Sequence, residues 1–98
     1  MHYLYILYSP SHDKFYVGES QDFRKRLLKH NESPFHSYTK KYRPWELYTV
    51  FECEDRSQGR SCEAFIKKQK SKAFIRNLKT MELHQAPLNT LKRINTVG

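Results

Sequence analysis

The chain has 98 residues, which suits one domain with a modest hydrophobic core. Its formal net charge of +8 at pH 7 favours a polyanionic partner, most simply a nucleic acid, over a merely soluble basic surface. No segment has the length of a membrane span. Cys53 and Cys62 make neither a disulfide framework nor a zinc site, so we expect reduced, buried thiols in a cytoplasmic protein.

The first expected elements are two antiparallel strands at residues 3–8 and 13–19, joined by a turn that contains Pro and Ser. In the expected register Tyr5 lies opposite Tyr16. Because side chains alternate along a strand, one face is then apolar and the other carries tyrosines around Gly18. The glycine would leave an open spot where a ligand can approach the backbone.

A helix is expected next, capped by Ser20 or Asp22. Arg26 and His30 lie four residues apart, on the shoulder of its apolar stripe. Turning these two side chains inward is costly unless they have partners or a function there. For His30, a ring at the core edge that is satisfied by backbone groups stays open as the alternative.

Residues 31–44 are expected to form a loop that mixes aromatic and cationic side chains. Such a mixture suits stacking on bases and contacts with phosphates. Rings that only anchor the loop on the fold explain it equally well. The candidate nucleic-acid contacts in this loop are His36, Tyr38, Lys40, Lys41 and Arg43.

The third strand is expected at residues 45–53, where even and odd positions are both apolar, as in a central strand covered on both faces. A second helix follows, with Ser57 as its candidate cap, and a third covers residues 71–78. These elements predict an α/β fold: a small three-stranded antiparallel sheet flanked by helices, in the order β-β-α-β-α-α.

We expect residues 1–80 to form this domain and residues 81–98 to be a polar, flexible tail. Within the tail, residues 88–94 fit either a short helical turn or a basic extension.

Several of these residues together resemble the GIY-YIG nuclease superfamily. The run Tyr3-Leu4-Tyr5 stands where that family has Gly-Ile-Tyr, and Tyr16-Val17-Gly18 stands where it has Tyr-Ile-Gly. Arg26 and His30 follow the second motif at the family's spacing, and Glu63 lies later on a helix. The resemblance covers residues 2–79 and is closest to the small stand-alone bacterial members.

The resemblance implies a divalent-metal-dependent endonuclease. Glu63 would bind Mg²⁺ or Mn²⁺ with several waters as further ligands, and Arg26 would hold a phosphate oxygen. One of Tyr5 and Tyr16 would be the base, with His30 favouring the phenolate or accepting its proton. Without the resemblance, an ion pair with Lys67 would explain Glu63. The resemblance also implies Asn77 as an accessory residue. Gly18, from its open spot, and Lys67, from the excess of positive charge, are expected to contact nucleic acid.

The expected substrate is DNA, cleaved with low sequence specificity, because 98 residues leave no room for a separate DNA-reading domain. Selectivity for branched or single-stranded DNA, in repair or recombination, fits this size, and we expect a monomer that does not associate with membranes. Two other classes stay open: a catalytically inactive nucleic-acid-binding module of the same fold, and an RNA-binding protein of the ribosomal type. Metal-dependent nicking that disappears with Glu63→Ala would exclude both.

Overall fold

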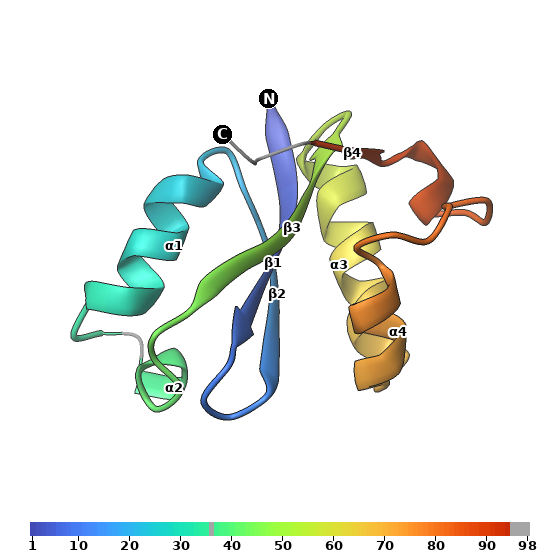
Figure 1. The fold of residues 1–98 in the computed structure, drawn as a ribbon. Helices are drawn as coiled ribbons and strands as arrows, with labels where there is room; N and C mark the ends of the chain where they lie inside the picture. The colour runs from blue at the N-terminus through green and yellow to red at the C-terminus, as the bar shows by residue number, and fades with distance from the viewer. Residues whose placement is uncertain (36, 95–98) are drawn as a thin grey trace.

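The computed structural model describes residues 1–35 and 37–94, which form one antiparallel sheet with helices on both faces (Figure 1). The strand order is β2-β1-β3-β4, with α1 on one face and α3 and α4 on the other. The elements are β1 (His2–Ser9), β2 (Lys14–Ser20), α1 (Phe23–Glu32), α2 (Ser37–Lys40), β3 (Glu46–Cys53), α3 (Arg56–Lys68), α4 (Lys72–Asn77), the 3₁₀ turn η1 (Leu88–Thr90) and β4 (Lys92–Arg93). No helix in the described ranges is long and apolar enough to cross a membrane.

The expected α/β class is confirmed, but the expectation of three strands is wrong. The fourth strand, β4, comes from the C-terminal segment and pairs with β3. Its Arg93 donates hydrogen bonds to the carbonyls of Leu78 at 2.6 Å and Met81 at 2.7 Å. A polar strand of two residues has no alternating pattern, so periodicity could not predict it. Of the two alternatives left open for residues 88–94, a short helical turn is present as η1, and its Leu88 is buried.

The β1–β2 hairpin differs from the expected register by two residues, because Tyr5 pairs with Gly18 rather than with Tyr16. The strands pair right up to the turn, where Asp13 adopts a left-handed φ of 50° that aspartate tolerates. A shift of two residues leaves each side chain on its face. The separation into a tyrosine face and an apolar face therefore holds.

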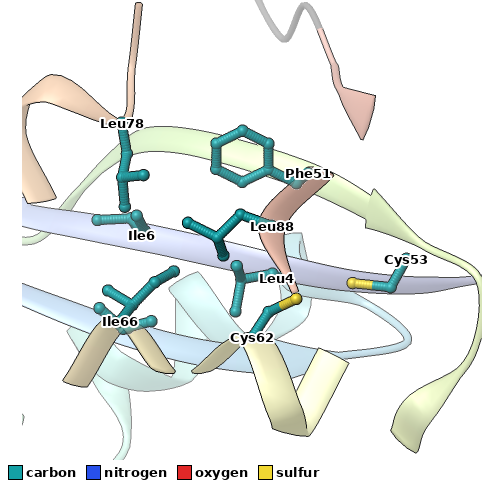
Figure 2. Close-up of a cluster of buried hydrophobic side chains, with 9 residues drawn as sticks. Leu4, Ile6, Phe51, Cys53, Cys62, Ile66, Leu78 and Leu88 are labelled. Atoms are coloured by element: carbon teal, nitrogen blue, oxygen red, sulfur yellow. The ribbon is translucent and has the colours of Figure 1, made fainter. Parts of the chain in front are cut away.

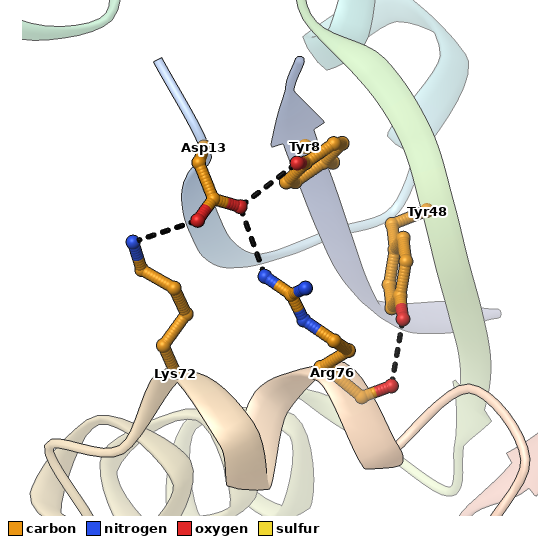
Figure 3. Close-up of polar contacts among 5 residues, drawn as sticks. All are labelled: Tyr8, Asp13, Tyr48, Lys72 and Arg76. Carbon is orange, nitrogen blue, oxygen red and sulfur yellow. Dashed lines mark hydrogen bonds and ion pairs between the residues drawn. The ribbon is translucent and has the colours of Figure 1, made fainter.

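A polar network at the surface ties this turn to α4 (Figure 3). The Asp13 carboxylate accepts hydrogen bonds from Tyr8 at 2.8 Å, Arg76 at 2.9 Å and Lys72 at 3.2 Å. The Tyr8 and Lys72 hydrogen bonds hold the pKa of Asp13 below its ordinary value. Tyr48 donates to the backbone carbonyl of Arg76 at 2.7 Å. Exposed pairs of this kind are individually weak, but together they fix the start of β2 against α4.

Two hydrophobic clusters lie on the two faces of the sheet. Figure 2 shows most of the cluster under α3 and α4, which contains Leu4, Ile6, Val17, Phe51, Cys53, Cys62, Ile66, Leu78 and Leu88. The cluster under α1 contains Tyr5, Leu7, Phe23, Trp45 and Val50. Strand β1 contributes to both, and none of its residues from Leu4 to Leu7 has exposed surface. Both cysteines are free and buried, as predicted.

Side-chain caps explain where the helices begin. Asp22 caps α1, as one of the two expected candidates. The expectation of Ser57 as the cap of α3 is wrong, because Asp55 accepts a hydrogen bond from the backbone N–H of Gln58 at 2.8 Å. A carboxylate two residues earlier satisfies the free N–H groups of the first turn, so the helix starts before Ser57. Ser71 caps α4.

The segment expected as a loop at residues 31–44 is partly helical, since α1 continues to Glu32 and α2 follows. Arg43 closes the C-terminal end of α1 by donating to the carbonyls of His30 at 2.6 Å and Ser33 at 2.5 Å. The Asn31 amide exchanges two hydrogen bonds with the backbone of Trp45. These long-range contacts order a segment whose composition alone indicates a loop.

The space above Gly18 is filled by the ring of Tyr5 rather than left open. A Cβ at Gly18 would lie 2.5 Å from the Tyr5 hydroxyl oxygen and 2.6 Å from Cζ, closer than side-chain atoms approach one another. The glycine is therefore required for Tyr5 to lie flat against β2.

Replacing Gly18 with alanine should push the Tyr5 ring aside and lower the free energy of unfolding by about 1–3 kcal/mol, as expected for overpacking. Gly59→Ala is the matched control, because a Cβ there meets nothing closer than 3.3 Å and alanine favours a helix. Urea denaturation of both variants measures the difference. A Gly18→Ala protein as stable as the wild type would contradict the close packing.

Candidate functional site

Three residues expected at the site meet on the face of the sheet under α1. Tyr5 comes from β1, Tyr16 from the edge strand β2 and His30 from α1. The Tyr5 hydroxyl lies 3.2 Å from Nε2 of His30. The ring centroid of Tyr16 is 4.4 Å from that of His30 and 6.3 Å from that of Tyr5. The structure thus brings both motif tyrosines and the histidine into one contact group.

Tyr5 is completely buried, whereas Tyr16 is partly exposed. Burial raises the pKa of the Tyr5 phenol to about 12, although a hydrogen bond with Arg26 opposes the shift. Tyr5 therefore keeps its proton at neutral pH. Of the two tyrosines, Tyr16 is the one that solvent can reach.

Arg26 is partly buried beside Tyr5, and the hydrogen bond between them raises the pKa of the guanidinium. Its Nε is buried without a hydrogen-bond partner among the described residues. A buried donor of a charged group that lacks an acceptor is costly. An oxyanion placed against the guanidinium would supply that acceptor.

Glu63 lies on α3, and its side chain is 23% exposed. Its carboxylate forms an ion pair with Nζ of Lys67 at 2.6 Å, and its charge contributes to the raised pKa of Tyr5. Glu63 therefore stands within electrostatic reach of the tyrosine group. No group of three potential metal ligands occurs among the described residues. An ion bound at Glu63 would take its other ligands from water or substrate, which suits Mg²⁺ better than a metal held in an all-protein cage.

Two adjoining hollows meet at Arg56, one lined by Arg26 and the other by Glu63. One, of about 540 Å³, is lined by Arg26, Lys25 and Lys29 of α1 as well as by Arg56. The other, of about 470 Å³, is lined by Glu63, Lys67, Arg60, Arg56, Glu19 and Ala64. The hollows share Arg56 and Glu19, so a row of cations passes from α1 to α3 beside the site.

Sequence reasoning named Lys67 but missed the other cations of this row, and it also missed Thr39. The signal for the α3 part was present, because residues 56, 60, 63 and 67 are spaced to share one face of a helix. No pattern indicated Thr39, whose hydroxyl oxygen lies 3.2 Å from Nδ1 of His30. That contact depends on how α2 folds back onto α1, which the local sequence does not show.

The other expected contacts are distributed differently. Tyr38, Lys40 and Lys41 are exposed on or next to α2, and Arg43 is engaged with the end of α1. Asn77 is exposed at the end of α4 and does not line the two hollows. His36 lies outside the described residues.

The raised pKa of Tyr5 predicts a loss of stability in alkali. The folded protein keeps the Tyr5 proton, which the unfolded chain releases near pH 10. The contribution of the protonated phenol to the free energy of unfolding is therefore complete below pH 10 and is lost as the pH rises through about 12. A shift of this size corresponds to about 3 kcal/mol. Denaturation between pH 9 and 12 should show a smaller decline for Tyr5→Phe than for the wild type, whereas the exposed Tyr38→Phe should decline as the wild type does. If the free energy of unfolding declined equally with pH in all three proteins, the raised pKa would not belong to Tyr5.

Comparison with known proteins agrees with the motifs at this site. The model of one family, described as the GIY-YIG catalytic domain, matches residues 1–78 of the 98-residue chain. No curated protein matches the chain. The matched region takes in the two tyrosine motifs, Arg26, His30 and Glu63. This chain therefore belongs to the GIY-YIG catalytic domain family, a family of nucleases.

Proposed function

We propose that this protein is a divalent-metal-dependent endonuclease that hydrolyses DNA phosphodiester bonds with low sequence specificity. The observation that carries the proposal is the contact group of Tyr5, Tyr16 and His30, with Arg26 and Glu63 lining the two adjoining hollows beside it. Phosphodiester hydrolysis needs an activated water, charge stabilisation at phosphorus and help for the leaving oxygen. The tyrosines and His30 could activate the water, and Arg26 could stabilise the charge at phosphorus.

Glu63 would hold Mg²⁺ or Mn²⁺, and its partly exposed carboxylate in an open hollow fits that role. The bound ion would act as a Lewis acid on the phosphate. Lys67, now paired with Glu63 at 2.6 Å, would be released toward the DNA backbone when the carboxylate takes up a cation. The ion pair is thus compatible with metal binding, because an exposed pair on a helix contributes only roughly 0.3–0.5 kcal/mol.

Arg26 would bind an oxygen of the scissile phosphate, since its buried Nε lacks an acceptor among the described residues. Tyr16 would be the tyrosine that contacts the attacking water or the phosphate, because it is partly exposed. Tyr5 would stay protonated beneath it and hold the guanidinium in place. This division favours Tyr16 over Tyr5 as the residue that meets the nucleophile.

The row of cations around Arg56 would hold the DNA backbone on either side of the cleaved phosphate. The exposed cations of this row line the two hollows beside Arg26 and Glu63. They are Lys25, Lys29, Arg56, Arg60 and Lys67. Lys40 and Lys41 next to α2, and Lys68 after Lys67, would extend this basic border. Phosphate contacts carry no sequence information, which fits low sequence specificity.

The substrate would be branched or single-stranded DNA. The protein would act on it as a cytoplasmic monomer, in repair or recombination.

Glu63→Gln should abolish Mn²⁺-dependent nicking, by orders of magnitude, because the metal ligand is lost. DNA affinity should stay the same or increase, since a negative charge near the phosphates is removed. The melting temperature should change little. The measurement compares nicking, DNA affinity and melting of wild type and variant on single-stranded, nicked, flapped and branched DNA.

Glu82→Gln is the control for this variant, because Glu82 is 84% exposed and its partner is the equally exposed His84. Nicking that survives Glu63→Gln would place the metal elsewhere. A wild type that binds DNA yet cleaves none of these substrates would replace the proposal with the inactive binding module.

Arg60→Ala should weaken DNA binding and reduce the slope of log affinity against log salt by about one, because one phosphate contact and its released counterion are lost. Arg24→Ala is the matched control: this exposed arginine of α1 lies outside the two hollows. Titrations at several salt concentrations measure both slopes. Equal slopes for the two variants would exclude the row around Arg56 as the DNA path.

A further inference from the structure

A row of three buried polar side chains runs from the sheet to α2 beneath the site. The Tyr5 hydroxyl lies 3.2 Å from Nε2 of His30, and Nδ1 of the same ring lies 3.2 Å from the Thr39 hydroxyl. The three residues are 0%, 1% and 3% exposed. Thr39 is itself held, because its backbone carbonyl accepts a hydrogen bond from the Trp45 indole at 2.8 Å. Water therefore cannot easily replace any member of the row.

The direction of the hydrogen bonds in this row follows from the buried phenol of Tyr5, which keeps its proton at neutral pH and therefore has an O–H to donate. The positive charge of the Arg26 guanidinium beside it favours the oxygen lone pairs on that side and turns the O–H away from Arg26, toward His30. The phenol O–H remains to donate, and Nε2 of His30 stands at 3.2 Å as its acceptor. A neutral imidazole whose Nε2 accepts carries its proton on Nδ1.

We propose that Thr39 is a positioning residue that holds His30 in the Nδ1-protonated tautomer by accepting a hydrogen bond from Nδ1–H. The order of donors is then Tyr5 to His30 and His30 to Thr39, with the Arg26 guanidinium beside the phenol. The inference rests on the function proposed above, in which Arg26 binds the phosphate.

Loss of the Thr39 hydroxyl would remove the acceptor that favours Nδ1–H and allow the other tautomer of His30. The Nε2–H of that tautomer would point at the Tyr5 oxygen and turn the phenol O–H toward the Arg26 guanidinium, which has only protons to offer. The guanidinium would lose its fixed partner on the sheet and with it the orientation toward the phosphate. Thr39 would therefore influence catalysis without touching substrate.

Three variants of the full chain separate this role from simple packing. Thr39→Val keeps the shape but removes the hydroxyl, and Thr39→Ser restores the hydroxyl. Thr49→Val makes the same change at a threonine that is 6% exposed on β3. Long-range proton–nitrogen NMR spectra of the histidine rings report the tautomer of His30 directly. We expect Nδ1–H in the wild type, Thr39→Ser and Thr49→Val, and loss of that preference in Thr39→Val.

Nicking by the same proteins gives the second readout. Thr39→Val should lower kcat roughly ten- to hundredfold, the range found when the partner that orients a metal-bound histidine is removed. Thr39→Ser and Thr49→Val should stay near the wild type. The losses in Thr39→Val and Tyr5→Phe should not add in the double variant, because both break the same row.

An Nε2–H tautomer in the wild type would overturn the inference. So would a Thr39→Val protein that matches Thr49→Val in both tautomer and turnover. If Thr39→Val does not fold, the wild-type and Thr39→Ser tautomers still decide the direction of the row. If the wild type cleaves no DNA, the proposed function fails while the NMR result stands on its own.

Discussion

The burial of the Tyr5 phenol against Gly18 is the constraint on which this structure depends. Tyr5 belongs to the central strand, and its ring lies where any Cβ on the neighbouring strand would stand. A phenol in that position brings a hydroxyl group into the interior, and a buried hydroxyl needs hydrogen-bond partners. His30 and Arg26 meet that need. One contact thus links the hairpin pairing, the orientation of α1 and the polar groups of the site.

Local sequence patterns predicted β1, β2 and β3 and the helices α1, α3 and α4, because these follow from side-chain periodicity or capping chemistry, but they did not indicate α2 or β4. Alternation along the first two strands separated tyrosines from apolar residues, and the spacing of Arg26 and His30 turned both toward the sheet. The hairpin register escaped prediction, since the left-handed conformation of Asp13 and its contacts with α4 fix where the turn lies. Those contacts join residues nearly sixty positions apart, which no local pattern records.

The site was predictable in its chemical groups but less so in their surroundings. Both motif tyrosines and His30 come together, with Arg26 beside them, and Glu63 of α3 lines a hollow that adjoins the one lined by Arg26. The basic loop is the clearest difference. Its Arg43 serves the end of α1, while the cations beside the site come from the helices themselves. Net charge therefore indicates the kind of partner and says little about which cations meet it.

The short strand β4 bears on how copies of this chain behave toward one another. An uncovered sheet edge offers free N–H and C=O groups to a strand from another molecule, which leads to edge-to-edge aggregation. On the β3 side this edge is partly occupied by β4, whose two residues are both exposed cations, and the N–H of Ile94 bonds to the carbonyl of Val50 at 3.0 Å. A second sheet that approaches there meets positive charge. Among the described residues, β4 thus places positive charge on the sheet edge opposite β2, where it opposes pairing with a strand from another molecule.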